Sequence, residues 1–167
     1  MFRKIDDFER HWQQERETTL KVFKTLTDAS LSQAVSSEDR NLGRIAWHIT
    51  QAIPEMMGHV GLKVDGPAMD VAVPTRAADI CAAYERASKS VLELVKAQWK
   101  DDTLLIEDDL YGERWSRGFT LVALIGHEVH HRGQMSVLMR QAGLVVPGIY
   151  GPAREEWVNY GMAAPAI

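Results

Sequence analysis

The sequence has a single cysteine, Cys81, which excludes an intramolecular disulfide and makes a reducing compartment the simpler expectation. It also lacks any apolar run near the roughly 20 residues that a helix needs to cross a bilayer. Its first residues, MFRKIDDFERHW, are too charged for the apolar core of a signal peptide. We therefore expect a soluble, cytoplasmic protein that does not use a membrane as a partner.

Strong positive charge is absent as well. The formal net charge is −4 at pH 7, and no long run of lysine and arginine offsets it, which argues against a general nucleic-acid-binding protein. Hydrophobic residues make up 46% of the chain and charged residues 25%, a balance typical of globular proteins with a packed core. The length of 167 residues suggests that residues 1–167 form one domain, and no internal repeat is present.

Apolar residues recur at three- and four-residue steps in four long segments, which is the pattern of amphipathic helices. The segments are residues 3–30, about 42–60, 76–99 and 119–142. Pro54 is expected to kink the second of them or to mark a local irregularity near its end. Residues 101–118 place short apolar pieces around Gly112, a pattern typical of a small hairpin or an ordered loop. We predict an all-α four-helix bundle that ends in an irregular tail at residues 143–167.

The fourth predicted helix carries two histidines on its apolar stripe. His127 and His131 lie between Leu124 and Leu138 at helical spacing, so the pattern turns both imidazoles toward the bundle interior. Their i, i+4 spacing places both rings on one face, where they can converge on one cation. Two adjacent titratable rings are costly in a dry core unless a partner satisfies them. A metal site is one interpretation of this pair, and ordinary core packing is the other.

A metal site in a bundle needs a further ligand from a facing helix, and His48 is the preferred candidate. It lies near the apolar face of the second helix, in RIAWHITQA. His59 follows eleven residues later near the end of that helix, and only one of the two is expected to reach the pair. His11 falls off the apolar stripe of the first helix, which favours the surface. His130 is turned about 100° from its neighbour, which favours the surface or the surroundings of the site.

Residues 127–131, HEVHH, also fit H-E-x-x-H, the helix motif of zinc metalloproteases. In that interpretation Glu128 is the general base, and Glu155 or Glu156 is the distant metal ligand. The extended protease motif requires glycine where the sequence has Gln134, and the predicted bundle lacks strands that could hold a peptide. The protease is therefore the less favoured alternative.

The motif HEVHHRGQMSVLMRQAG at residues 127–143, together with His48 in AWHIT, resembles the DinB family, also described as DinB/YfiT-like metalloenzymes. The family pattern is His-x-x-x-His followed by Arg-Gly-Gln, and then an apolar stretch that ends in Leu-Arg-Gln-x-Gly. The resemblance covers about residues 3–145, and its most specific part is H-x-x-x-H-R-G-Q. Two features depart from the pattern: Glu128, which creates the protease-like motif, and the tail.

This resemblance implies a four-helix bundle, a divalent site of three histidines (His48, His127 and His131) holding zinc or nickel, and a homodimer. Characterised members of the wider superfamily include thiol-dependent S-transferases and isomerases that use low-molecular-weight thiols. We therefore expect a metal-dependent thiol transferase or hydrolase acting on a small molecule. The alternative is a non-catalytic metal-binding or stress-response bundle. An apolar strip of Val122, Ile125 and Val129 is compatible with a dimer interface and equally with core packing.

Three neutral imidazoles leave a divalent ion with open positions for water or for a thiol, whose pKa the ion lowers. The candidate catalytic residues around such a site are Gln134 and Glu128. Gln134, on the interior stripe, is positioned to hydrogen-bond a ligand ring or a substrate, whereas Arg132 is expected to brace a helix contact. Glu15 and Thr19, on the first helix, are candidates for contacts around the ligands, although a solvated Glu15 is the more ordinary expectation.

Overall fold

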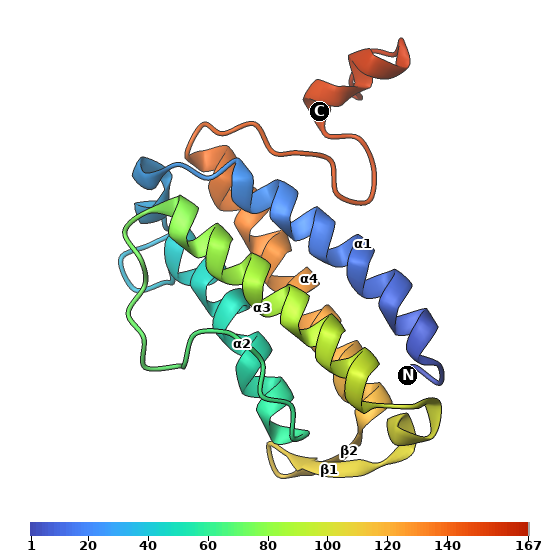
Figure 1. Cartoon of the computed structure of the whole chain (residues 1–167). Coiled ribbons are helices and arrows are strands. Elements are labelled where there is room, and N and C mark those ends of the chain that lie inside the picture. Colours follow the sequence, from blue (N-terminus) through green and yellow to red (C-terminus); the bar gives the residue numbers. More distant parts are fainter. Residues whose placement is uncertain (167) are drawn as a thin grey trace.

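The computed structural model describes residues 1–166 and contains four long helices that pack side by side (Figure 1). Their bounds are Ile5–Lys24 for α1, Leu42–His59 for α2, Ala77–Gln98 for α3 and Arg117–Gln141 for α4. The main helix pairs in contact are α1 with α3, α3 with α2, α2 with α4 and α4 with α1. The helices therefore form a four-cornered bundle in which α2 and α4 are neighbours. The predicted four-helix bundle is confirmed.

The connection between α2 and α3 returns along the length of the bundle, so these two helices run in the same direction (Figure 1). Local capping determines where several helices begin. The Asn41 side chain accepts a hydrogen bond from the Arg44 amide at the start of α2, and Ser116 accepts one from the Phe119 amide at the start of α4. Helix α2 continues through Pro54 to His59.

The first helix is shorter than the predicted segment 3–30. Helix α1 ends at Lys24, and a separate 3₁₀ helix follows at Asp28–Ser32. The cause is local, because Thr27 adopts an extended backbone and exchanges side-chain hydrogen bonds with Ser30. This reciprocal cap begins a new turn instead of continuing the old one.

A small antiparallel hairpin crosses one end of the bundle, as predicted for residues 101–118 (Figure 1). Strand β1 is Glu107–Leu110 and strand β2 is Glu113–Ser116. The turn between them is formed by Tyr111, with φ 54°, and Gly112, with φ 85°. Positive φ at both central residues is the geometry of the turn that matches strand twist. The hairpin contacts α2 and α4, and Leu110 is fully buried.

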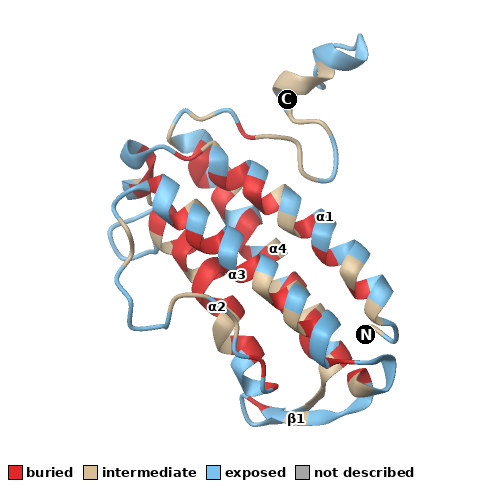
Figure 2. Cartoon of the chain, in the orientation of Figure 1, coloured by how far each residue is buried: buried red, intermediate tan, exposed pale blue. Residues whose placement is uncertain are grey.

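The buried side chains line the faces of the helices that point into the bundle, and the solvent-facing sides are exposed (Figure 2). The largest of the fully buried apolar side chains include Trp12, Phe8, Tyr84, Leu42 and Ile53. The tail after α4 is irregular apart from a 3₁₀ helix at Arg154–Tyr160. Across residues 1–166, none of the helices has the length and apolar character that a membrane crossing requires.

Candidate metal centre

The neighbouring helices α2 and α4 bring three imidazoles together between them. His48 comes from α2, and His127 and His131 come from successive turns of α4. Each offers a ring nitrogen, and these three atoms all lie within 4.8 Å of one another. The ring centroids are 4.8 Å apart for His48–His127, 4.7 Å for His48–His131 and 4.5 Å for His127–His131. We call these three residues the histidine triad.

The donor atoms of the triad fit a divalent ion. The Nε2 atoms of His48 and His127 are 3.1 Å apart. Two nitrogens that each lie about 2.0–2.1 Å from a tetrahedral ion would be separated by roughly 3.3 Å. The Nδ1 atom of His131 faces the Gln134 side-chain oxygen at 2.7 Å, so an Nδ1–H that donates there leaves the Nε2 lone pair available. These three residues could therefore hold a metal ion.

The protein by itself does not satisfy the ring of His48. Its Nδ1 is buried without a hydrogen-bond partner among residues 1–166, and its Nε2 faces only another imidazole. A histidine that serves only core packing is expected to bond a carbonyl or another polar group. What favours the metal interpretation over core packing is the His48 Nε2, which meets the Nε2 of His127 rather than a carbonyl or hydroxyl group; an ion bound there would leave the Nδ1 unpartnered.

The surroundings keep these imidazoles neutral, which is the protonation state that binds a metal. Burial, assisted by the positive charge of Arg40, lowers the pKa of His48 to about 4. Burial and the neighbouring rings lower the pKa of His127 to about 4 as well. Burial also lowers the pKa of His131, in opposition to its hydrogen bond with Gln134. Protons therefore compete poorly with a metal for this site near neutral pH.

This electrostatic environment predicts an unusual pH dependence of metal affinity. Ordinary histidines have a pKa of about 6.5, so a site built from them loses affinity as the pH falls through that value. Because the pKa values of His48 and His127 are lowered to about 4 and that of His131 is also lowered, we expect the affinity of the triad for zinc to fall less between about pH 7.5 and pH 6 than that of a site of ordinary histidines. Competition against a chelator, corrected for the protonation of the chelator, measures this affinity. A decline as large as that of a site of ordinary histidines would contradict the lowered pKa values.

Gln134 is exposed at the edge of the interface between α2 and α4, so its predicted place on the interior stripe is wrong. Gln134 lies three positions after His131, a rotation of about 300° around the helix, or about 60° in the opposite sense. This rotation places its side chain off the buried face. Its side chain nevertheless reaches back to the Nδ1 of His131. In this position Gln134 orients a triad ring and also lines a cavity beside it.

Glu128 points away from the triad, which corrects its assignment as a general base beside a metal. The carboxyl group is buried on the side of α4 that faces α1 and α3. Its Oε1 accepts hydrogen bonds from the Thr19 hydroxyl at 2.5 Å and from the Tyr84 hydroxyl at 2.8 Å. Burial raises the pKa of Glu128 to about 7. One position along a helix rotates a side chain by about 100°, and here that rotation directs the carboxylate into the core.

The two glutamates proposed as the distant protease ligand are engaged elsewhere. Glu155 forms an ion pair with Arg140 at 2.6 Å, and Glu156 accepts hydrogen bonds from the amides of Gly148 and Ala153. The third imidazole at the site comes from His48 instead. The structure thus provides neither the base nor the distant ligand of the protease interpretation.

The remaining histidines lie outside the triad. His59 contacts the Glu55 carboxylate at 3.2 Å and is partly exposed. His130 is exposed on α4, and His11 lies 3.5 Å from the Glu15 carboxylate with about half of its side chain exposed. Of the two α2 candidates, it is therefore His48 that faces α4.

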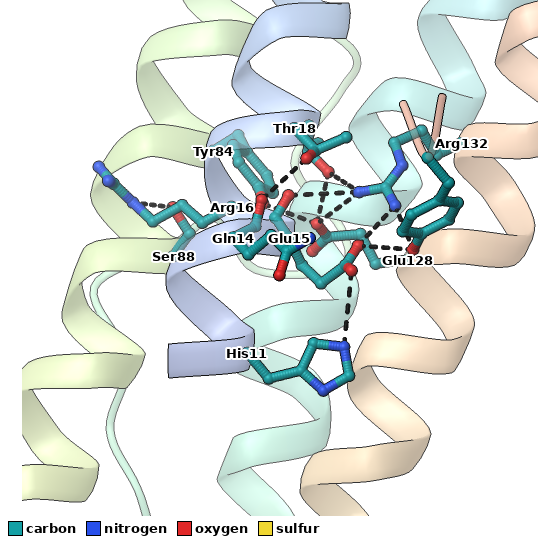
Figure 3. Close-up of polar contacts among 11 residues, drawn as sticks. His11, Gln14, Glu15, Arg16, Thr18, Tyr84, Ser88, Glu128 and Arg132 are labelled. Atoms are coloured by element: carbon teal, nitrogen blue, oxygen red, sulfur yellow. Dashed lines mark hydrogen bonds and ion pairs between the residues drawn. The ribbon is translucent and has the colours of Figure 1, made fainter. Parts of the chain in front are cut away.

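On the face of α4 that is turned toward α1, a buried polar network joins the two helices (Figure 3). The predicted solvation of Glu15 is wrong, because its side chain is 2% exposed and pairs with the Arg132 guanidinium at 2.5 Å. Arg132 also donates to the Thr19 hydroxyl and to the Glu15 carbonyl. The hydroxyl of Tyr150, in the tail, donates to the Glu15 carboxylate. We call this set the Glu15–Arg132 network, and it agrees with a bracing role for Arg132.

The sequence interpretation missed the two tyrosines of this region. Tyr84 lies on the core stripe of α3, and a buried tyrosine hydroxyl requires a polar partner, which was the available signal. Here Glu128 is that partner. Nothing in the sequence pattern of the tail indicated that Tyr150 would contact a buried ion pair.

Two cavities border the triad. The first, which we call the hairpin cavity, has a volume of about 390 Å³ and includes His48 and His127 in its wall. The second, which we call the Arg40 cavity, has a volume of about 640 Å³ and includes His131 and Gln134. A molecule in either cavity would therefore lie beside at least one of the three imidazoles.

A four-helix bundle with three imidazoles gathered between α2 and α4 defines this chain as a DinB-like helical protein whose three histidines could hold a metal ion. The sequence profile of the DinB family matches residues 1–163, so the chain belongs to the DinB family. This match confirms the resemblance seen in the histidine motif.

Individual relatives agree with this assignment. An uncharacterized protein of Bacillus subtilis, YrdA, is 46% identical over 167 residues, which is the whole of both chains. The crystal structure of a DinB-like protein from Bacillus cereus has a TM-score of 0.87 and 43% identity, covering 90% of this chain and 100% of that one. A second DinB-like protein, YjoA of Bacillus subtilis, has a TM-score of 0.67 over 86% of this chain and 96% of its own. Its identity of 18% makes it evidence for the fold alone.

Proposed function

We propose that this protein is a metal-dependent enzyme that acts on a small molecule, with zinc or nickel held by His48, His127 and His131. The observation that carries the proposal is the convergence of three imidazoles with lowered pKa values at a point bordered by two cavities. An ion held by three protein ligands keeps coordination positions open for a substrate. This is typical of catalytic metal sites, whereas in structural sites the protein fills every coordination position.

When bound, a divalent ion supplies Lewis-acid chemistry that lowers the pKa of a thiol or of water. The chain supplies the rest. Gln134 fixes the orientation of the His131 ring, which keeps its Nε2 directed toward the other two imidazoles. The mainly apolar walls of the hairpin cavity lie beside His48 and His127, where they can contact a substrate. The choice of thiol-dependent S-transfer as the reaction, with hydrolysis as the second possibility, rests on the family resemblance.

The test is a turnover assay on protein purified without an affinity tag and loaded with zinc or with nickel. Bacillithiol, mycothiol, glutathione and coenzyme A serve as thiols against an alkyl halide acceptor, and an ester serves for hydrolysis. We expect at least one reaction to run about 100-fold faster than with metal-free protein, because nucleophile activation by a metal is worth several kcal/mol.

His11→Ala is the matched control, because His11 lies on α1, outside the triad, with about half of its side chain exposed. This variant should keep full activity, whereas His48→Ala should lose it. Absence of turnover in every metal-loaded form would contradict the enzyme and favour a non-catalytic metal-binding bundle.

A further inference from the structure

The hairpin cavity is lined by parts of the chain that are far apart in sequence. His48 and His127 are among its lining residues, so an occupant lies beside two members of the triad. The walls come from α2, from α4, from the connection between α2 and α3, and from the hairpin. The apolar members are Ala52, Met56, Met69, Tyr111, Trp115 and Ala123. Methionine and aromatic side chains form an adaptable apolar surface, which suits an apolar group.

The polar groups at this cavity already have partners within the protein. Glu55 is the one lining residue that carries a carboxylate, and its Oε2 accepts a hydrogen bond from the Tyr111 hydroxyl at 2.7 Å. Its Oε1 lies 3.2 Å from the His59 Nε2. The indole N–H of Trp115 donates to Glu113 at 2.8 Å. A polar occupant would therefore find few free partners, and an anionic one would also meet the negative charge of Glu55.

The backbone conformation of Tyr111 is a second, independent observation in favour of a functional cavity. It is the one non-glycine residue with positive φ in the described part of the chain, at 54°. Glycine, asparagine and aspartate are the residues that usually occupy this turn position, and a bulky side chain there is strained. The ring is held at the cavity by Glu55 and by edge contacts with His59, at 5.4 Å, and Trp115, at 5.8 Å. Strain that is retained at a cavity wall points to a functional requirement for the side chain.

The Arg40 cavity, which borders the triad at His131, has a mixed lining. Three charged residues, Glu38, Asp39 and Arg40, lie there beside four apolar ones, Val35, Ile45, Val137 and Leu138. The two cavities thus offer different environments to a substrate. The residues that line the Arg40 cavity carry charges of both signs and include no aromatic side chain besides the imidazole, whereas the hairpin cavity is mainly apolar and includes two aromatic side chains besides its two imidazoles.

We infer that the hairpin cavity binds an uncharged apolar group, of the size of a phenyl ring or a short branched alkyl chain, on the substrate that reacts at the triad. Tyr111 and Trp115 determine this specificity. The inference rests on the proposed metal centre and adds to it the chemical class of the substrate.

The test uses cobalt-loaded protein and three hydroxamates, which share one metal-binding group. They are acetohydroxamate, benzohydroxamate and 4-carboxybenzohydroxamate, and the visible absorption of cobalt reports their binding. We expect benzohydroxamate to bind at least about tenfold more tightly than acetohydroxamate, because its ring is removed from water in the cavity. The charged 4-carboxy compound should lose most of this advantage.

The main variant is Tyr111→Asn, because asparagine is accepted at this turn position and the hairpin should keep its fold. It should reduce the preference for benzohydroxamate to about threefold or less and leave acetohydroxamate binding unchanged. Trp115→Ala should act in the same direction. The control is Val137→Ala, which removes an apolar side chain from the Arg40 cavity and should leave the preference unchanged.

Three other outcomes would overturn the inference, and each shows which part of it is wrong. Equal binding of the three hydroxamates to cobalt-loaded protein would refute the apolar subsite while leaving the metal centre intact. Loss of the preference in Val137→Ala, with retention in Tyr111→Asn, would assign the ring to the other cavity. A chain that takes up no cobalt would refute the metal centre and the subsite with it.

Discussion

His48→Ala is expected to lower the affinity for zinc or nickel at least about 100-fold, as are His127→Ala and His131→Ala. Loss of a residue that merely orients a metal ligand already costs 10–100-fold in affinity, so loss of a ligand should cost more. The measurement is metal content per chain after dialysis of untagged protein, followed by a chelator competition for each variant.

Two controls keep this result interpretable. His130→Ala and His59→Ala remove imidazoles that lie outside the triad, and both should retain the metal. Helical circular dichroism of the metal-free variants should match that of the parent, because His48 contributes an unsatisfied polar atom rather than a bond to the core. Stoichiometric metal in His48→Ala would refute the three-histidine centre.

Arg132→Met is expected to lower the free energy of unfolding by about 3–5 kcal/mol, the largest stability change that we predict. The variant leaves the Glu15 carboxylate buried without its cation, and an uncompensated buried charge is costly. It also removes donors from the Thr19 hydroxyl and the Glu15 carbonyl. Urea unfolding of the metal-free protein, followed by circular dichroism, measures the change.

A double variant distinguishes the effect of an unpaired buried charge on stability from the effect of lost packing. Because replacing both partners of a buried pair by apolar residues is often neutral, Glu15→Met combined with Arg132→Met should recover most of the lost stability. Arg76→Met breaks an exposed ion pair with Asp79 and should leave stability unchanged. If the double variant were as unstable as Arg132→Met alone, packing rather than charge would be the cause.

The Glu15–Arg132 network also bears on the geometry of the triad. Glu128 directly follows His127, and Arg132 directly follows His131. Both charged side chains are held on the face of α4 that points away from α2, by partners on α1 and α3. Because a helix rotates as a unit, this anchoring fixes the direction in which the two imidazoles point. The part of the H-E-x-x-H motif that suggested a protease thus has a structural role.

Much of the architecture was predictable from local sequence. The 3.6-residue period located all four helices, and the apolar pieces around Gly112 located the hairpin. The i, i+4 spacing of His127 and His131 placed their rings on one face, and H-x-x-x-H-R-G-Q indicated the family. These features depend on a single helix or turn, so the sequence alone determines them.

Only the tertiary structure decided which groups meet across helices. Periodicity gives the face of a helix on which a side chain lies, but it does not identify the helix that covers that face. Packing of α2 against α4 shows that His48, the candidate preferred from the sequence, and not His59, lies beside the pair. Packing of α1 against α4 buried Glu15 with Arg132, and the return of the tail brought Tyr150 to them. These contacts join residues 79 to 135 positions apart, and no local pattern encodes such distances.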